Sequence, residues 1–257
     1  MPLQQTKAVV LAVRTYDEAD KIVTVYGQVT GKLNGIAKGA QRSRIRFVNK
    51  LELFSLLELG YEESRSSGLV RLDQAELIQP FATIRSDYPS YAAACLVGEL
   101  VRLWTREADA DPRLFSLLTW VLAAIDRLPL PRHGNSLAPP VIYFEIKLLD
   151  LLGYRPDLSG CLGCGALDPD RRPYHFSLGT GGLICSICNR ESRHGLIPLS
   201  LATARILARA QQLPNDKLAR LQLPPASALE ALNFLHHFSR HLLQREIHSR
   251  DSLKNLL

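Results

Sequence analysis

The chain has 257 residues, of which 46% are hydrophobic and 22% charged, and these proportions fit a globular protein and exclude an intrinsically disordered one. Its 31 Lys and Arg residues outnumber its 25 Asp and Glu residues, a modest excess that weakly favours a polyanionic partner. The apolar runs are far shorter than the roughly 20 residues of a transmembrane helix. The first residues also lack the pattern of a secretory signal.

The N-terminal part of the sequence predicts a small β-barrel. It contains five short stretches of strand-forming residues separated by polar turns, namely Lys7–Arg14, Asp20–Tyr26, Lys32–Lys38, Leu51–Tyr61 and Leu69–Leu77. Five strands in so short a segment favour the OB-fold, which is the common five-stranded barrel. We therefore expect an OB-fold domain over residues 1–80.

Apolar residues recur at helical spacing after Pro80. The pattern predicts helices over Tyr88–Ala108, Pro112–Ile125, Pro140–Leu152, Ser200–Leu213 and Pro225–Ile247, with a Pro-rich loop over Leu128–Pro140. Asp111 and Pro112 are typical of a helix start, because Asp caps the first turn and Pro fits the first helical position. The predicted class is α+β multidomain, with a helical domain over residues 81–157 that continues over 197–257 around a cysteine module at 158–196.

Four of the five cysteines form two CxxC pairs, Cys161 with Cys164 and Cys185 with Cys188. Each CxxC turn can direct two thiolates at one cation, so the two pairs predict a tetrahedral Zn²⁺ site. Four thiolates leave no coordination position for water or substrate, so we expect a structural zinc ion. Degenerate or redox-active pairs are the alternative, although a redox CxxC usually stands alone near a βαβ pattern. Metal-binding cysteines suit a reducing compartment, which predicts a cytoplasmic protein.

Residues 31–50 contain six basic residues and no Asp or Glu. They are Lys32, Lys38, Arg42, Arg44, Arg46 and Lys50, with Phe47 as an interleaved aromatic. On an OB-like barrel this stretch would lie where a nucleic-acid strand usually runs. A solvated loop without function is the alternative. If all six cations engaged phosphates, the logarithm of the affinity for single strands would fall with log salt at a slope of roughly −4.

Other polar clusters are weaker signals. His237 and His241 are four residues apart and could bind a metal, but a solvated or phosphate-facing helix surface is the favoured interpretation. Asp17, Glu18 and Asp20 follow the first predicted strand and favour turn and surface roles over metal binding. P-loop, GxGxxG, GxSxG and HExxH motifs are absent, as is the HxE of zinc deaminases.

The sequence resembles the RecO family of bacterial DNA repair and recombination mediators nearly from end to end. The most specific segments are YFEIKLLDLLGYRPDLSGCLGCG at residues 143–165 and FSLGTGGLICSIC at residues 176–188. Further similarity lies in RTYDEADKIVTVYGQVTGKLNGIAKGAQR, in LVGELVRLW and DPRLFSLLTWVLAAI, and in the C-terminal IHSRDSLKNL.

The resemblance implies an OB-fold, a helical domain and a four-cysteine zinc module. It implies a protein that binds single- and double-stranded DNA, anneals complementary strands, and binds RecR and single-stranded-DNA-binding protein. These partners would help to load RecA onto gapped DNA, with RecF and RecA as indirect partners of the chain, in the cytoplasm at the nucleoid. By analogy, Lys32, Lys38, Arg42, Arg44 and Arg46 would contact DNA.

Two other functional classes remain open on the sequence. A nucleic-acid enzyme would need clustered carboxylates or an open metal position, and neither is evident, so we predict a protein that is not an enzyme. A protein-interaction scaffold would bind DNA only weakly at physiological salt. A salt titration of DNA binding separates the scaffold from the mediator.

Overall fold

The computed structural model describes residues 3–63, 68–128, 137–171, 173–189 and 195–250. The chain forms two compact units, Met1–Arg127 and Leu128–Leu257, which are here called the N-terminal and C-terminal units. The predicted Pro-rich loop falls largely outside the described residues. The end of the C-terminal IHSRDSLKNL segment, after residue 250, also lies outside them. Across the described ranges, no helix has the length and apolar character needed to traverse a bilayer.

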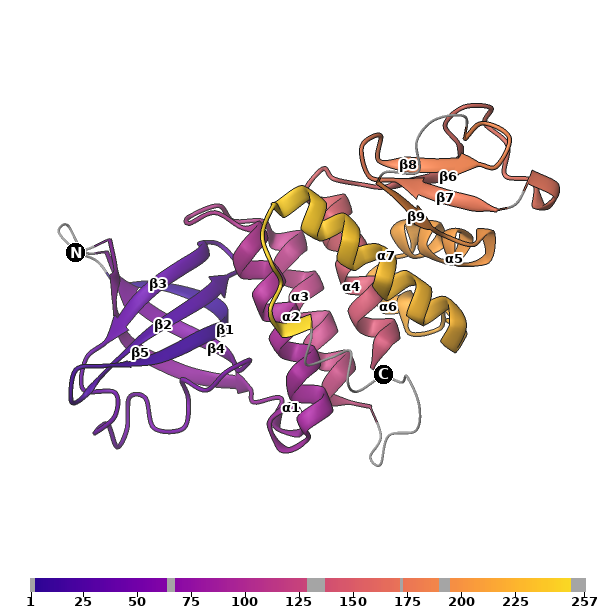
Figure 1. The fold of residues 1–257 in the computed structure, drawn as a ribbon. Coiled ribbons are helices and arrows are strands. Elements are labelled where there is room, and N and C mark those ends of the chain that lie inside the picture. The colour runs from indigo at the N-terminus through magenta and orange to yellow at the C-terminus, as the bar shows by residue number, and fades with distance from the viewer. Residues whose placement is uncertain (1–2, 64–67, 129–136, 172, 190–194, 251–257) are drawn as a thin grey trace. The chain divides into compact units, whose positions relative to one another are not determined.

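Five strands of the N-terminal unit close into a barrel in the order β1-β2-β3-β5-β4 (Figure 1). The strands are β1 (Gln4–Tyr16), β2 (Asp20–Gly27), β3 (Gly31–Ala37), β4 (Leu56–Glu62) and β5 (Val70–Gln79). The neighbours β3 and β5 are parallel, whereas the other neighbouring pairs are antiparallel and β4 closes the ring on β1. The predicted OB-like barrel is confirmed.

The barrel core explains why β4 begins later than the sequence predicts. Alternate residues of the strands point inward, among them Val23 and Val25 of β2. Leu51 belongs to the same core although it precedes β4, and Phe47 joins it from the same connection. An apolar run there fills the barrel without forming a strand, so periodicity alone could not place the start of β4.

Three helices follow the barrel in the same unit, α1 (Ala82–Ser86), α2 (Tyr88–Trp104) and α3 (Pro112–Asp126). The Asp87 side chain accepts a hydrogen bond from Ser90 N, and Asp111 accepts one from Arg113 N, so both longer helices have an acidic N-cap. The helix start at Pro112 is confirmed. Helix α2 ends at Trp104 rather than at the expected Ala108, because Thr105 is extended and the chain turns toward β3.

The C-terminal unit combines helices with a small sheet (Figure 1). The strands of this sheet pair in the order β6-β8-β7-β9. Its helices are α4 (Ala138–Leu151), α5 (Leu201–Gln212), α6 (Asn215–Leu218) and α7 (Pro225–Leu243). Its strands are β6 (Asp157–Cys161), β7 (Tyr174–Ser177), β8 (Gly182–Cys185) and β9 (Leu196–Pro198), and a short 3-10 turn spans Pro169–Arg171. Phe176 of β7 packs edge-on against Phe234 and Phe238 of α7. These aromatic contacts stabilise the packing of the sheet on α7.

A buried ion pair holds the end of the described chain within this unit. Glu145 of α4 is fully buried, and both of its carboxylate oxygens accept from Arg250 Nη2, at 2.7 and 2.6 Å. Ser239 Oγ donates a further hydrogen bond of 2.7 Å to Glu145, and Arg250 Nη1 donates to the Leu232 carbonyl. The pair therefore ties α4, α7 and the residues after α7 together.

Candidate metal centre and nucleic-acid interface

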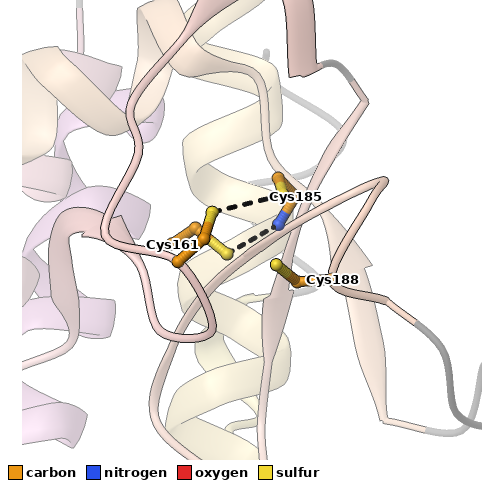
Figure 2. A group of neighbouring side chains, drawn as sticks. Cys161, Cys185 and Cys188 are labelled. Carbon is orange, nitrogen blue, oxygen red and sulfur yellow. Dashed lines mark hydrogen bonds between the residues drawn. The ribbon is translucent and has the colours of Figure 1, made fainter.

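The sulfur atoms of Cys161, Cys164, Cys185 and Cys188 all lie within 4.8 Å of one another. Among the described residues, this is the single group of three or more His, Cys, Asp or Glu side chains close enough to hold a metal ion. Figure 2 shows the side chains of Cys161, Cys185 and Cys188 converging from separate segments of the chain. The four residues that the CxxC spacing predicts as ligands are thus brought together.

Parallel pairing of β6 with β8 explains how distant cysteines meet. Cys161 ends β6 and Cys185 ends β8, and parallel neighbours have their carboxyl ends at the same edge of a sheet. Each CxxC turn then closes on itself, because Gly165 N donates to the Cys161 carbonyl and Asn189 N donates to the Cys185 carbonyl. A Cβ atom at Gly163 would lie 2.9 Å from Cys188 Cβ, so the first turn has room only for glycine.

Backbone N–H groups point at the sulfur of Cys161. Burial raises the pKa of this thiol, but hydrogen bonds from the N–H groups of Cys185, Gly163 and Cys164 outweigh burial and lower the pKa to about 6. A side-chain hydrogen bond with Cys164 is the main cause that raises the pKa of Cys188 to about 12. Four thiolates this close together repel one another, so a cation is needed for all four to ionise.

The connection from β3 to β4 carries most of the predicted DNA-binding residues. We call residues 38–50 the basic loop; it contains Lys38, Arg42, Arg44, Arg46 and Lys50. Lys38, Arg42 and Arg44 are exposed. Within the described chain, Arg42 is the one of these three residues that forms an ion pair. It pairs with Glu18 at 3.5 Å, and both side chains are more than 70% exposed. An exposed pair is worth little, so a phosphate could readily replace the carboxylate.

Two other basic side chains of the loop hold its structure. Arg46 donates hydrogen bonds to the carbonyls of Lys38 and Asp73, and Lys50 forms an ion pair with Glu76 at 3.0 Å. The start of the loop is fixed as well, because Gly39 N donates to the Asp20 carboxylate. The loop therefore presents its exposed cations from a braced backbone.

Lys32 lies in β3, outside the loop, and its ammonium group faces the C-terminal end of α2. Lys32 Nζ donates to the Arg102 carbonyl at 3.0 Å and also to the Thr105 carbonyl. Cations are favoured at this end of a helix, where carbonyl groups lack helical partners. Burial lowers the pKa of Lys32, and Glu107 partly offsets that effect.

The segment between α2 and α3 covers part of the outer face of β2 and β3, which is the usual ligand face of an OB-fold. Ala108 N donates to the Lys32 carbonyl, Asn34 bonds to Glu107, and Tyr26 Oη accepts from Asp111 N. A Cβ atom at Gly31 would lie 2.3 Å from the Asp109 carbonyl oxygen, so the approach is close. A nucleic-acid strand is therefore excluded from this part of the face while the segment is in place.

Comparison with known proteins agrees with this architecture. Residues 1–81 match the family model described as "Recombination protein O N terminal", and residues 85–251 match the one described as "Recombination protein O C terminal". The chain belongs to the RecO family. Its members include proteins named DNA repair protein RecO, one from Syntrophus aciditrophicus (strain SB) that is 32% identical over 95% of this chain and 93% of its own length. Another, from Anaeromyxobacter sp. (strain K), is 34% identical over 96% of this chain and 94% of its own length.

The weaker sequence signals form no metal-binding group among the described residues of this RecO family member. Asp20 anchors the basic loop, and Asp17 Oδ1 accepts from Glu18 N within its turn. His237 and His241 are exposed on α7 and belong to no metal-binding group among the described residues.

Two features of the basic loop were not predicted from the sequence of this RecO family member. Phe47, expected as an interleaved aromatic, is only 3% exposed and lies in the barrel core. Ile45, which belongs to no predicted motif, is 81% exposed between Arg44 and Arg46. An apolar residue inside an arginine-rich run was the one signal that could have drawn attention to it.

Proposed function

We propose that this protein is a recombination mediator that is not an enzyme and acts in DNA repair. It binds single- and double-stranded DNA, anneals complementary strands and, with RecR, helps to load RecA onto DNA coated by single-stranded-DNA-binding protein. RecF and RecA would be indirect partners, and the site of action would be the nucleoid in the cytoplasm. The observation that carries the proposal is the braced, cationic basic loop on an OB-like barrel in a RecO family chain.

Annealing requires no catalytic group, because base pairing itself supplies the free energy. The barrier is the mutual repulsion of two phosphate backbones, and a cationic surface that neutralises both lowers that barrier. Lys38, Arg42 and Arg44 supply such a surface, and Arg46 and Lys50 add positive charge within the same loop. Because the segment between α2 and α3 covers part of the β2–β3 face, the strand would run along the basic loop instead.

The four-cysteine cluster supports a structural role for Zn²⁺. Thiolate ligands suit zinc, and four of them complete its tetrahedron without leaving a position for water. Cys161, Cys164, Cys185 and Cys188 would hold the ion and join the two CxxC turns. The zinc would thereby stiffen the sheet that packs on α7 rather than take part in DNA chemistry.

A charge-reversal experiment tests the proposal. The double variant Arg42→Glu/Arg44→Glu should lose most of its affinity for single-stranded DNA and most of its annealing rate. The control Arg209→Glu/Arg220→Glu makes the same change in net charge at exposed arginines of the C-terminal unit and should keep both properties. If the two double variants behave alike, the basic loop is not the DNA site.

The salt dependence gives a second measure of the same contact. If Lys38, Arg42 and Arg44 each engage one phosphate of a single strand, the slope of log affinity against log salt should be about −2. Arg42→Glu/Arg44→Glu should flatten that slope. Labelled DNA recovered at its original length after these assays would agree with the absence of nuclease activity.

A further inference from the structure

Ile45 is the most exposed of the large apolar side chains in the described chain, at 81% of its surface. Scattered apolar residues on a protein surface are ordinary and need no explanation. Ile45 differs in its surroundings, because the residue lies between two arginines of the basic loop. Together with Gly39, Arg42, Ser43, Arg44 and Arg46 it lines a shallow hollow of about 450 Å³.

The composition of this hollow suits a nucleotide. Its lining includes three arginines and no Asp or Glu, so the hollow favours an anion. Glu18 and Asp73 pair with Arg42 and Arg46 from outside the lining, through partly or fully exposed side chains that a phosphate can replace. Ile45 supplies the apolar surface of the hollow. A nucleotide has matching parts, because its anionic phosphate can contact the arginines and the flat apolar face of its base can contact Ile45.

The residues that flank Ile45 are already held in the free protein, so binding at Ile45 should cost little conformational entropy. Phe47, two residues further on, is buried in the barrel, and its N–H donates to Ser43 Oγ at 3.0 Å. Arg46 is held by the Lys38 and Asp73 carbonyls. Fixed residues on both sides of Ile45 reduce the entropy that binding must overcome.

We propose that Ile45 contacts the unpaired bases of single-stranded DNA while Arg42 and Arg44 hold the adjacent phosphates. The inference rests on the proposed DNA-binding function and gives it a preference for single strands. In a duplex the base faces are stacked, and an isoleucine can reach them only if a base step is opened at a cost of a few kcal/mol. A single apolar contact in each loop leaves the other bases of the strand free to pair.

The test compares Ile45→Ala with wild-type protein by fluorescence anisotropy on three oligonucleotides of equal length: a single strand, a duplex and a single strand without bases. Ile45→Ala should weaken binding to the normal single strand by about three- to tenfold, toward the low end of what base stacking on an aromatic side chain contributes, because isoleucine has no ring. Binding to the duplex and to the abasic strand should stay unchanged. The salt slope should also stay the same, because no phosphate contact is removed.

Matched variants keep the two proposals separate. Val29→Ala removes an apolar side chain that is 67% exposed in the β2–β3 turn, outside the basic loop, and should change no affinity. Equal loss of affinity on all three oligonucleotides, or none on the normal single strand, would overturn the role of Ile45. If Arg42→Glu/Arg44→Glu still weakens binding in that case, the proposed DNA site survives and only the base contact fails.

Discussion

Lys32 and Arg44 carry the same charge twelve positions apart, yet their neighbours give them different tasks. The ammonium group of Lys32 is engaged by two main-chain carbonyls at the end of α2. Arg44 is exposed, and no ion pair within the described chain involves it. The charge of a residue therefore indicates its role only together with the partners that the fold provides.

Replacing Lys32 should affect stability more than DNA binding. Lys32→Ala removes two charge-assisted hydrogen bonds and a cation at a helix C-terminus, so the free energy of unfolding should fall by about 1–2 kcal/mol. Lys38→Ala, which changes an exposed cation of the basic loop, should leave stability unchanged and weaken DNA binding instead. Urea denaturation and a DNA titration of both variants measure this contrast, and the reverse pattern would refute it.

The buried pair of Glu145 and Arg250 predicts a large penalty for removing one partner. Arg250→Met leaves the Glu145 carboxylate buried without its cation, which should cost about 3–5 kcal/mol of unfolding free energy. The double variant Glu145→Leu/Arg250→Met should recover much of that loss, because no buried charge remains. Chemical denaturation of both variants gives the two values.

The matched control for this pair lies on the same helix. Asp150 of α4 pairs with Arg155 at 3.6 Å, and the arginine is 51% exposed. Asp150→Asn should cost less than about 1 kcal/mol, as is usual for a surface pair. If Asp150→Asn lowers the free energy of unfolding as much as Arg250→Met does, the penalty does not depend on the burial of the ion pair.

At the scale of elements, the cysteine module depends on two parallel strands that end side by side. The module should bind one zinc ion per chain, released when a mercurial reagent titrates the four thiolates and detected with a chromogenic chelator. Cys164→Ser should reduce the zinc content sharply, because three thiolates hold the ion less firmly. Cys95→Ser lies outside the cluster and should retain it. A Cys164→Ser protein with full zinc content would contradict the assignment.

The sequence predicted elements well wherever local chemistry determines them. The Asp111–Pro112 helix start was predicted because its cap bond, from Arg113 N to the Asp111 side chain, is local, and the four cysteines were identified by their spacing. The strands β6 to β9 were missed, because they have three to five residues each and are stabilised by pairing with distant partners. The role of Lys32 was missed for the same reason, since its carbonyl partners lie about seventy residues further on.

At the scale of the whole molecule, the two units should respond differently to loss of metal. Both tryptophans, Trp104 and Trp120, lie in α2 and α3 of the N-terminal unit, whereas the cysteine cluster belongs to the C-terminal unit. Zinc removal should therefore lower the far-ultraviolet circular dichroism signal while the tryptophan emission maximum stays constant. Simultaneous change of both signals would mean that the units unfold as one.

The segment between α2 and α3 also has a bearing on self-association. Strand β3 pairs with β5 only through Gly35, Ile36 and Ala37, which leaves the other end of that edge without a strand partner in the barrel. The segment between α2 and α3 covers this edge through a parallel backbone β-bridge between Lys32 and Glu107. An uncovered strand edge is a template for pairing with another chain. Substitutions that loosen the segment would thus favour aggregation at high protein concentration, even where the barrel itself remains folded.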